Sequence, residues 1–189
     1  MRKRKKVIYW PDKLAHLLDN TYIKGLVSHN LGYLYSLQNE HHKAIDYYIS
    51  SMEYERQRNV NVNYLLNTIL CIIIEKYNIG DSKECGTWID EGLHLLCEHP
   101  HDYFREYYYH FHIYRYLIDP PGNDTLATFI EEEALPYFRE KDHKDSIIKY
   151  AYILAQHFKK LYKYKQANHY YEVSLRTINN NHHLGGIIL

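Results

Sequence analysis

Residues 31–51 read LGYLYSLQNEHHKAIDYYISS, and residues 154–174 read LAQHFKKLYKYKQANHYYEVS. Both stretches start with leucine and carry a small residue, an aromatic, a small residue, an aromatic and a small residue at offsets 1, 4, 13, 17 and 20. Spacings of three and four place residues on one face of a helix. Each stretch therefore predicts two helices that face each other across a short turn, with small residues that allow a close approach.

Two weaker copies lie between these stretches. The small residues that open the second helix are Ala44, Cys85, Ala127 and Ala167, spaced by 41, 42 and 40 residues, although Glu131 fits the aromatic position of its copy poorly. A period near forty predicts stacked helix pairs, over residues 22–58, 61–97, 101–140 and 143–179. Residues 1–21 are expected to form a basic tail and a short leading helix, and residues 180–189 a C-terminal tail. The individual helices are expected near 12–20, 22–38, 41–58, 61–78, 82–97, 101–118, 125–140, 143–161 and 164–179.

The composition favours long helices and few turns. The 189 residues include only 8 glycines and 5 prolines, and no segment shows the alternation of a half-buried strand. Breakers at 78–82 and 119–124 mark loops, where Asp81 or Ser82, and Asp124 or Thr125, can cap the helices that follow. The expected fold class is all-α, a solenoid of helix-turn-helix repeats.

The charge balance and the cysteines limit the binding partners and the cellular compartment that we expect for the protein. Lys+Arg and Asp+Glu are both 23, so no net field attracts nucleic acid or an anionic membrane. The basic run Arg2–Lys6 is the only hint of nucleic-acid binding, and a solvated tail is the favoured interpretation. The longest apolar run, residues 69–74, is too short to cross a bilayer, and no signal peptide is recognised. Three unpaired cysteines fit a reducing compartment, so we expect a cytoplasmic protein.

The repeat pattern resembles the tetratricopeptide repeat. The longer period and the sequence of residues 131–175, EEEALPYFREKDHKDSIIKYAYILAQHFKKLYKYKQANHYYEVSL, resemble the repeat domains of the cytoplasmic peptide-pheromone receptors of Gram-positive bacteria, the group that contains Rap, NprR and PlcR. This resemblance implies a right-handed superhelix whose inner face binds a short signalling peptide. It also implies an effector domain, which we do not expect within these residues, since only about twenty precede the first repeat. We expect either the sensory part of a longer or split regulator or a stand-alone repeat protein. DNA would be contacted only through such a domain, and we expect a homodimer formed through the terminal repeats.

A stripe on the first helix of each pair is expected to face the ligand, because it is displaced by two residues from the stripe that packs on the partner helix. Asparagine and glutamine can donate to and accept from a peptide group at once, and tyrosine supplies stiff apolar area with a polar tip. Asn67 and Gln156 are the leading candidates for holding a peptide backbone. The alternative for the tyrosines is a packing or solvated role. The candidate residues are His29, Asn30, Tyr33, Asn67, Ile74, Tyr109, His112, Tyr116, Tyr152 and Gln156.

Catalysis and metal binding find no support in the sequence. No glycine-rich phosphate loop or nucleophile motif occurs, and the acidic run Glu131–Glu133 fans around a helix as a solvated face. The segment Cys97–His101 could offer loop ligands to zinc, but no second half-site accompanies it. We therefore expect no enzyme activity, metal or cofactor. The main alternative to a peptide sensor is a scaffold that binds a segment of another folded protein.

Overall fold

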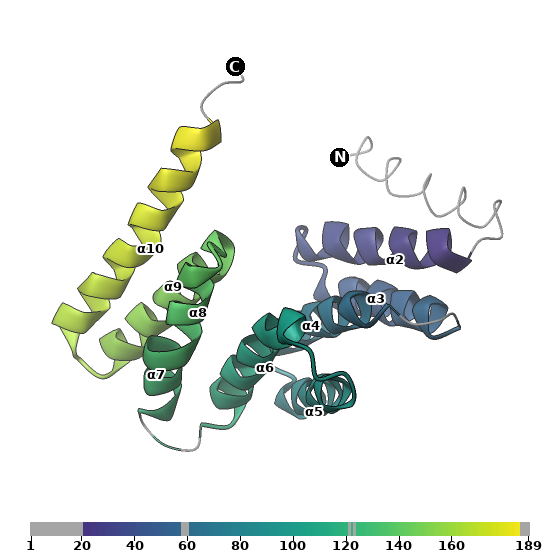
Figure 1. Ribbon diagram of the computed structural model, residues 1–189, viewed down its shortest axis with the longest axis horizontal. Coiled ribbons are helices and arrows are strands. Elements are labelled where there is room, and N and C mark those ends of the chain that lie inside the picture. The colour runs from purple at the N-terminus through teal and green to yellow at the C-terminus, as the bar shows by residue number, and fades with distance from the viewer. Residues whose placement is uncertain (1–20, 58–60, 121, 123, 186–189) are drawn as a thin grey trace. The chain divides into compact units, whose positions relative to one another are not determined.

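The computed structural model describes residues 21–57, 61–120, 122 and 124–185 (Figure 1). The chain forms two compact units, Met1–Ile118 and Asp119–Leu189, called unit 1 and unit 2 below. The expected helix at 12–20 and the basic run at 2–6 lie outside the described residues. All regular structure in the described residues is helical.

The helices of unit 1 follow one another through short turns, and successive helices pack side by side. They are α2 (Thr21–Ser36), α3 (His41–Arg56), α4 (Val62–Asn78), α5 (Ser82–Glu98) and α6 (Arg105–Ile118), with a 3₁₀ turn at Asp102–Phe104 before α6. Unit 2 contains α7 (Thr125–Phe129), a π-helical turn (Ile130–Ala134), α8 (Leu135–Glu140), α9 (Lys144–Lys160) and α10 (Tyr164–Gly185).

The helix predictions from residue 22 onward are confirmed to within a few residues at most ends. The helix α10 is longer than expected, since its backbone continues from the expected end at 179 to Gly185. The boundary between the two units falls in the loop of the third expected pair, 101–140, so its helices belong to different units. The division into four pairs therefore stays a prediction.

The expected helix at 125–140 is interrupted by the π-helical turn, which the sequence analysis did not anticipate. Pro136 follows this turn and has no N–H to donate to a carbonyl four residues back. Beside it, the N–H of Leu135 reaches back five residues to the carbonyl of Ile130. The missing donor thus coincides with the place where the helix widens, as is typical of single π turns.

The first helix pair is held together by a close approach at Gly32. A Cβ atom at this glycine would lie 2.7 Å from two ring carbons of Tyr48. The ring is 2% exposed and Ala44 on the same helix is fully buried. Figure 1 shows α2 lying along α3. The small and aromatic residues of the repeat therefore do what their spacing predicted: the ring of one helix packs on the bare backbone of the other.

The two strong copies of the repeat share two further contacts. Ser51 Oγ donates to the carbonyl of Gly25 at 2.9 Å, and Ser174 Oγ, at the corresponding position, donates to the carbonyl of Ile148 at 3.2 Å. Stacked aromatic rings also recur. The centroids are 5.2 Å apart for Tyr35 and Tyr47, and 5.8 Å apart for the corresponding Phe158 and Tyr170. The repeat is thus reproduced in its side-chain contacts as well as in its helices.

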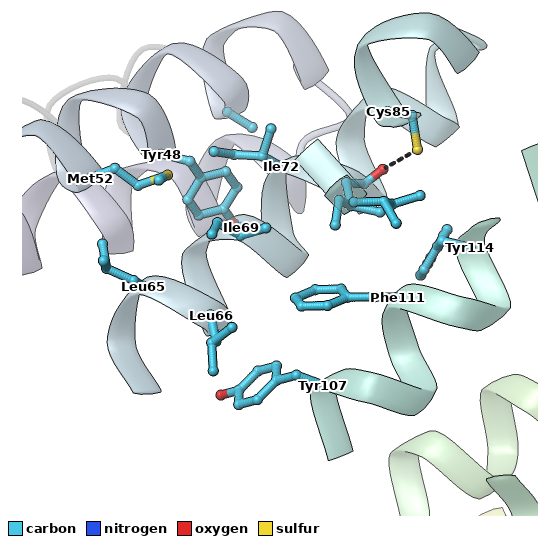
Figure 2. Packing of buried hydrophobic residues seen from close by; sticks show 13 residues of the cluster. Tyr48, Met52, Leu65, Leu66, Ile69, Ile72, Cys85, Tyr107, Phe111 and Tyr114 are labelled. Carbon is cyan, nitrogen blue, oxygen red and sulfur yellow. Dashed lines mark hydrogen bonds between the residues drawn. The ribbon is translucent and has the colours of Figure 1, made fainter. Parts of the chain in front are cut away.

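The core of unit 1 is formed by buried side chains of α3, α4, α5 and α6 (Figure 2). Ile69, Ile72 and Phe111 are at most 1% exposed, and the Cys85 thiol donates to the carbonyl of Ile73 at 3.6 Å. Burial raises the pKa of the Cys85 thiol to about 11, so this cysteine behaves as a small apolar residue. The apolar run at 69–74 is therefore a core segment.

The described turns between α2 and α3, α4 and α5, α8 and α9, and α9 and α10 share one geometry. Each contains a residue with positive φ, and the residue after it donates its N–H to the carbonyl five positions earlier, at 2.9 or 3.0 Å. This is the bond of the Schellman motif, which favours glycine at the left-handed position. The four residues are Asn39 (φ 56°), Gly80 (φ 76°), Asp142 (φ 53°) and Tyr162 (φ 59°).

The predicted cap of α5 is confirmed and that of α7 is only partly confirmed. Asp81 accepts the N–H of Glu84 at 3.2 Å, and this bond, with Lys76 at 3.1 Å, lowers the pKa of the Asp81 carboxyl. Asp124 stands at the cap position of α7 but makes no side-chain capping bond. Its carboxylate lies 3.7 Å from the ammonium of Lys163 instead.

Two glycines of α5 give a matched test of close approach. A Cβ at Gly92 would lie 2.5 Å from a ring carbon of Phe111, whereas one at Gly86 would meet its nearest neighbour, Arg115, at an ordinary 3.5 Å. We expect Gly92→Ala to lower the free energy of unfolding by about 1–3 kcal/mol, because the ring must move. Gly86→Ala should leave it unchanged or raise it by up to about 1 kcal/mol through helix propensity. Urea unfolding of both variants measures this, and equal effects would contradict the assigned packing.

The left-handed turn positions give a second test. Tyr162 is 78% exposed, so Tyr162→Gly loses little packing and relieves an unfavourable backbone conformation. We expect it to raise the thermal stability of the protein, by about 1 kcal/mol at most. Gly80→Ala is the reverse change, and a Cβ there would meet no atom within 4 Å. It should therefore cost about 1 kcal/mol through the backbone alone. Calorimetry measures the change in thermal stability of each variant. Changes of opposite sign support the turn geometry, and changes of the same sign contradict it.

Candidate functional site

The candidate residues of unit 1 lie on α2, α4 and α6, the helices expected to face a ligand. Tyr33 is 55% exposed and Asn30 is also exposed, whereas His29, Asn67 and Ile74 are half-buried. The structure joins His29 to Asn67 by a direct hydrogen bond, although they are 38 positions apart in the chain. These two candidates therefore belong to one local cluster between α2 and α4.

The ring of His29 lies among groups from α3 and α4. Its Nδ1 is 3.0 Å from Thr68 Oγ1, and its Nε2 is 3.4 Å from Asn67 Nδ2. The rings of Tyr48 and Tyr64 have their centroids 5.3 and 5.2 Å from that of His29. Burial lowers the pKa of His29 below its ordinary value of 6.5, so the ring is neutral at pH 7.

A second polar cluster, around Glu75, was missed by the sequence analysis. This carboxylate is 2% exposed, accepts a hydrogen bond from Ser36 Oγ at 2.5 Å and lies 2.5 Å from His41 Nδ1. It thereby joins α2, the start of α3 and α4. The only available signal was a lone carboxylate next to the apolar run that ends at Ile74, and its partners are 34 and 39 positions away.

On α6 the candidates differ in exposure. Tyr109 is 5% exposed, so little of its side chain is accessible to a ligand, contrary to the expected ligand-facing role. His112 is half-buried, and its ring contacts those of Tyr108 and Tyr116 at centroid distances of 4.3 and 6.1 Å. The tyrosines of this helix therefore take part in ring packing, on His112, on Phe111 and, for Tyr114, on Tyr77 of α4. Such packing is the alternative role given for the tyrosines above.

The candidates of unit 2 lie on α9. Tyr152 is 51% exposed, and its ring is 6.0 Å from that of Tyr171. Gln156 is half-buried and lines a surface hollow at the turn into α10. The other residues of this hollow are Lys159, Lys160, Tyr162 and Tyr164. The two lysines give this hollow positive charge, and much of its lining is apolar.

The acidic run of unit 2 is only partly solvated, which corrects the prediction for it. Glu132 and Glu133 are exposed, but Glu131 is half-buried and accepts a hydrogen bond from the hydroxyl of Tyr170 at 2.6 Å. Nearby, burial lowers the pKa of His157, and its buried Nε2 has no hydrogen-bond partner among the described residues. In the sequence, the poor fit of Glu131 to the aromatic position was the sign that this position has a different role from the aromatic residues in the strong copies of the repeat.

The described residues offer neither a metal site nor a membrane-spanning helix. No three histidine, cysteine or acidic side chains gather there in a way that would hold a metal ion. Cys97 is exposed, and His101 Nδ1 accepts the backbone N–H of Tyr103 at 3.0 Å. Among the helices of the described part, none has the length and apolarity needed to span a bilayer.

No protein-family model matches the chain. It is 32% identical over 171 residues to the transcriptional activator NprA of Geobacillus stearothermophilus, over 89% of this chain and 42% of NprA. This chain thus spans less than half the length of that curated relative.

Two solved structures share the fold. The apo form of the quorum sensor NprR from B. thuringiensis has a TM-score of 0.71 and 23% identity, over 84% of this chain and 43% of that one. The apo form of RapI has a TM-score of 0.73 and 15% identity, over 91% and 60%. The predicted all-α class and receptor resemblance are confirmed. The chain is similar in sequence to part of NprA, and it shares its helical-repeat fold with part of NprR and part of RapI.

Proposed function

We propose that this domain is the sensory part of a peptide-responsive transcriptional regulator and binds a short peptide. The observation that carries this proposal is the sequence relation to the transcriptional activator NprA over 171 residues. The fold shared with NprR, a quorum sensor, supports it. DNA would be reached through an effector domain, and the peptide would be sensed in the cytoplasm.

The side chains on the first-helix faces suit an extended peptide. Such a ligand needs partners for its backbone amides and surfaces for its side chains. Asn67 in unit 1 and Gln156 in unit 2 can each donate and accept, and both are half-buried. Tyr33 and Tyr152 are about half exposed, and their rings can pack on ligand side chains at low cost in conformational entropy.

The proposed mechanism is a shift between populations of the receptor. A peptide that contacts several helices at once binds one arrangement of the repeats better than another. Binding then shifts the equilibrium towards that arrangement. The free energy of this shift is no larger than the difference between the binding free energies of the two arrangements. The effector attached to or bound by the domain responds to that change.

Asn67→Ala tests the proposed site. We expect it to weaken binding of a retained peptide by about tenfold or more, because a buried peptide group loses its partner at a cost of roughly 1–3 kcal/mol. Gln156→Ala should act in the same direction. The protein would be incubated with a pool of random heptapeptides, and retained peptides would be measured by mass spectrometry after gel filtration.

The control for this experiment is Asn78→Ala, an exposed asparagine at the C-terminal end of the same helix as Asn67. It should retain peptides like the wild type. If Asn67→Ala and Gln156→Ala remain folded by circular dichroism and also retain peptides like the wild type, the proposed site is wrong.

A second candidate function, protein binding through α10, is favoured by one observation. Leu175 on α10 is 58% exposed, whereas Met52, at the corresponding position on α3, is 2% exposed and belongs to the core shared with α4. Asn168 is likewise exposed where Ile45 is buried. We propose that a second copy of the chain covers this face of α10, since a two-fold axis lets one surface serve both partners.

Leu175→Asp tests this interface. We expect the wild type to be a dimer at micromolar concentration by light scattering, and Leu175→Asp to be a monomer with an unchanged circular dichroism spectrum. Leu37→Asp is the control, because Leu37 is 63% exposed and lies on another part of the chain. A wild type that is monomeric throughout, or a dimer that Leu175→Asp leaves intact, would contradict the proposal.

A further inference from the structure

The hydrogen bonds around His29 form a chain that runs from the carbonyl of Tyr64 through Thr68 and His29 to Asn67. Thr68 Oγ1 is 3.0 Å from the carbonyl of Tyr64, and a threonine hydroxyl has one hydrogen, which it donates there. With its hydrogen on that carbonyl, Thr68 Oγ1 accepts from His29 Nδ1, 3.0 Å away. The proton of the neutral ring is thus on Nδ1, and Nε2 is bare.

A bare Nε2 constrains Asn67. It can only accept a hydrogen bond, so the group that Asn67 presents to it, at 3.4 Å, is the NH₂ of the carboxamide. The oxygen of the same carboxamide then faces away from the ring. Thr68 is fully buried, so the start of this chain of bonds is held inside the protein, while Asn67 at its end is half-buried.

We infer that His29 is a positioning residue that holds the Asn67 carboxamide with its oxygen available to a ligand, so that this point of the surface accepts a hydrogen bond from an N–H group. The matching ligand chemistry is a backbone amide of an extended peptide. The identity of the ligand in this inference rests on the proposed function. The orientation of Asn67 follows from the hydrogen-bond geometry and does not depend on the ligand.

Protonation of His29 reverses the preference of Asn67. When Nε2 carries a proton it becomes a donor, and the carboxamide must turn about its terminal bond so that the oxygen faces the ring. The NH₂ then points towards the ligand position, where it opposes another N–H. Peptide binding therefore weakens as the pH falls through the titration of His29, which lies below the ordinary 6.5 because of burial.

The two phenols that face His29 do not titrate in the same range as its ring. Tyr48 from α3 and Tyr64 from α4 contact the ring, and burial raises the pKa of both phenols, that of Tyr64 to about 12. Glu55 of α3 acts electrostatically on Tyr64, and Glu75 of α4 on Tyr48. The cause of the shift at His29 itself is burial.

Two substitutions separate the functions of the two ring nitrogens. The carboxamide oxygen of His29→Gln can stand where Nε2 stands and hold the NH₂ of Asn67, and it does not titrate. His29→Asn is shorter, reaches the position of Nδ1 and can donate to Thr68, but leaves Asn67 without its acceptor. If His29 had only a structural role, His29→Gln and His29→Asn would not differ in how they hold Asn67.

The first experiment is nuclear magnetic resonance on protein labelled with ¹⁵N at histidine and asparagine, titrated from about pH 7.5 to about pH 5. The Asn67 side-chain signal is assigned by its loss in Asn67→Ala. We expect the Nδ1–H tautomer of His29, an Asn67 signal that titrates with His29 in the wild type, and an Asn67 signal without that transition in His29→Gln. An Nε2–H tautomer, or an Asn67 signal unaffected by His29, would overturn the inference.

The second experiment repeats heptapeptide retention at the two pH values. We expect retention at least about tenfold weaker at the lower pH for the wild type, little pH dependence for His29→Gln and weak retention at both values for His29→Asn. Equal retention by all three proteins overturns the ligand part of the inference. If no protein retains peptide at either pH, the proposed function fails, and the tautomer and the Asn67 titration still decide whether His29 positions Asn67.

Discussion

The packing of an aromatic ring on the bare backbone of a neighbouring helix is the contact on which the rest of the structure depends. Tyr48 approaches Gly32 so closely that no Cβ fits between them, and Phe111 does the same at Gly92. Such contacts set how near two helices lie, and the small residues around them, such as Ala44, keep the interface flat. The contacts and turns shared by α2–α3 and α9–α10 follow from repeating that constraint.

This close packing also places the candidate site. Because α3 packs tightly on α2 and α4 packs on α3, His29 of α2 comes within hydrogen-bond distance of Asn67 and Thr68 of α4. A half-buried polar network is costly unless its groups are paired, and here hydrogen bonds join Asn67, His29, Thr68 and the carbonyl of Tyr64. The helix packing therefore decides which atoms this surface offers to a ligand.

The sequence predicts the helices well and the site only in part, for physical reasons. A period near forty and small residues at fixed offsets depend on local geometry, so α2 to α10 follow from them. The pairing of His29 with Asn67, and of Glu75 with Ser36, depends on contacts between helices almost forty residues apart, which a helical stripe does not specify. Tyr109 shows the same limit, because its position on the stripe predicted exposure and the fold buries it. The π turn before Pro136 had a local cause that the analysis did not use.

If this repeat domain senses a short peptide, native mass spectrometry of the protein isolated from its own cells should detect the bound ligand. We expect a species heavier than the bare chain by the mass of a short peptide, which is released and sequenced on collisional activation. Bare protein only, or protein bound only to a large folded partner, would contradict the peptide-sensing account and favour the scaffold.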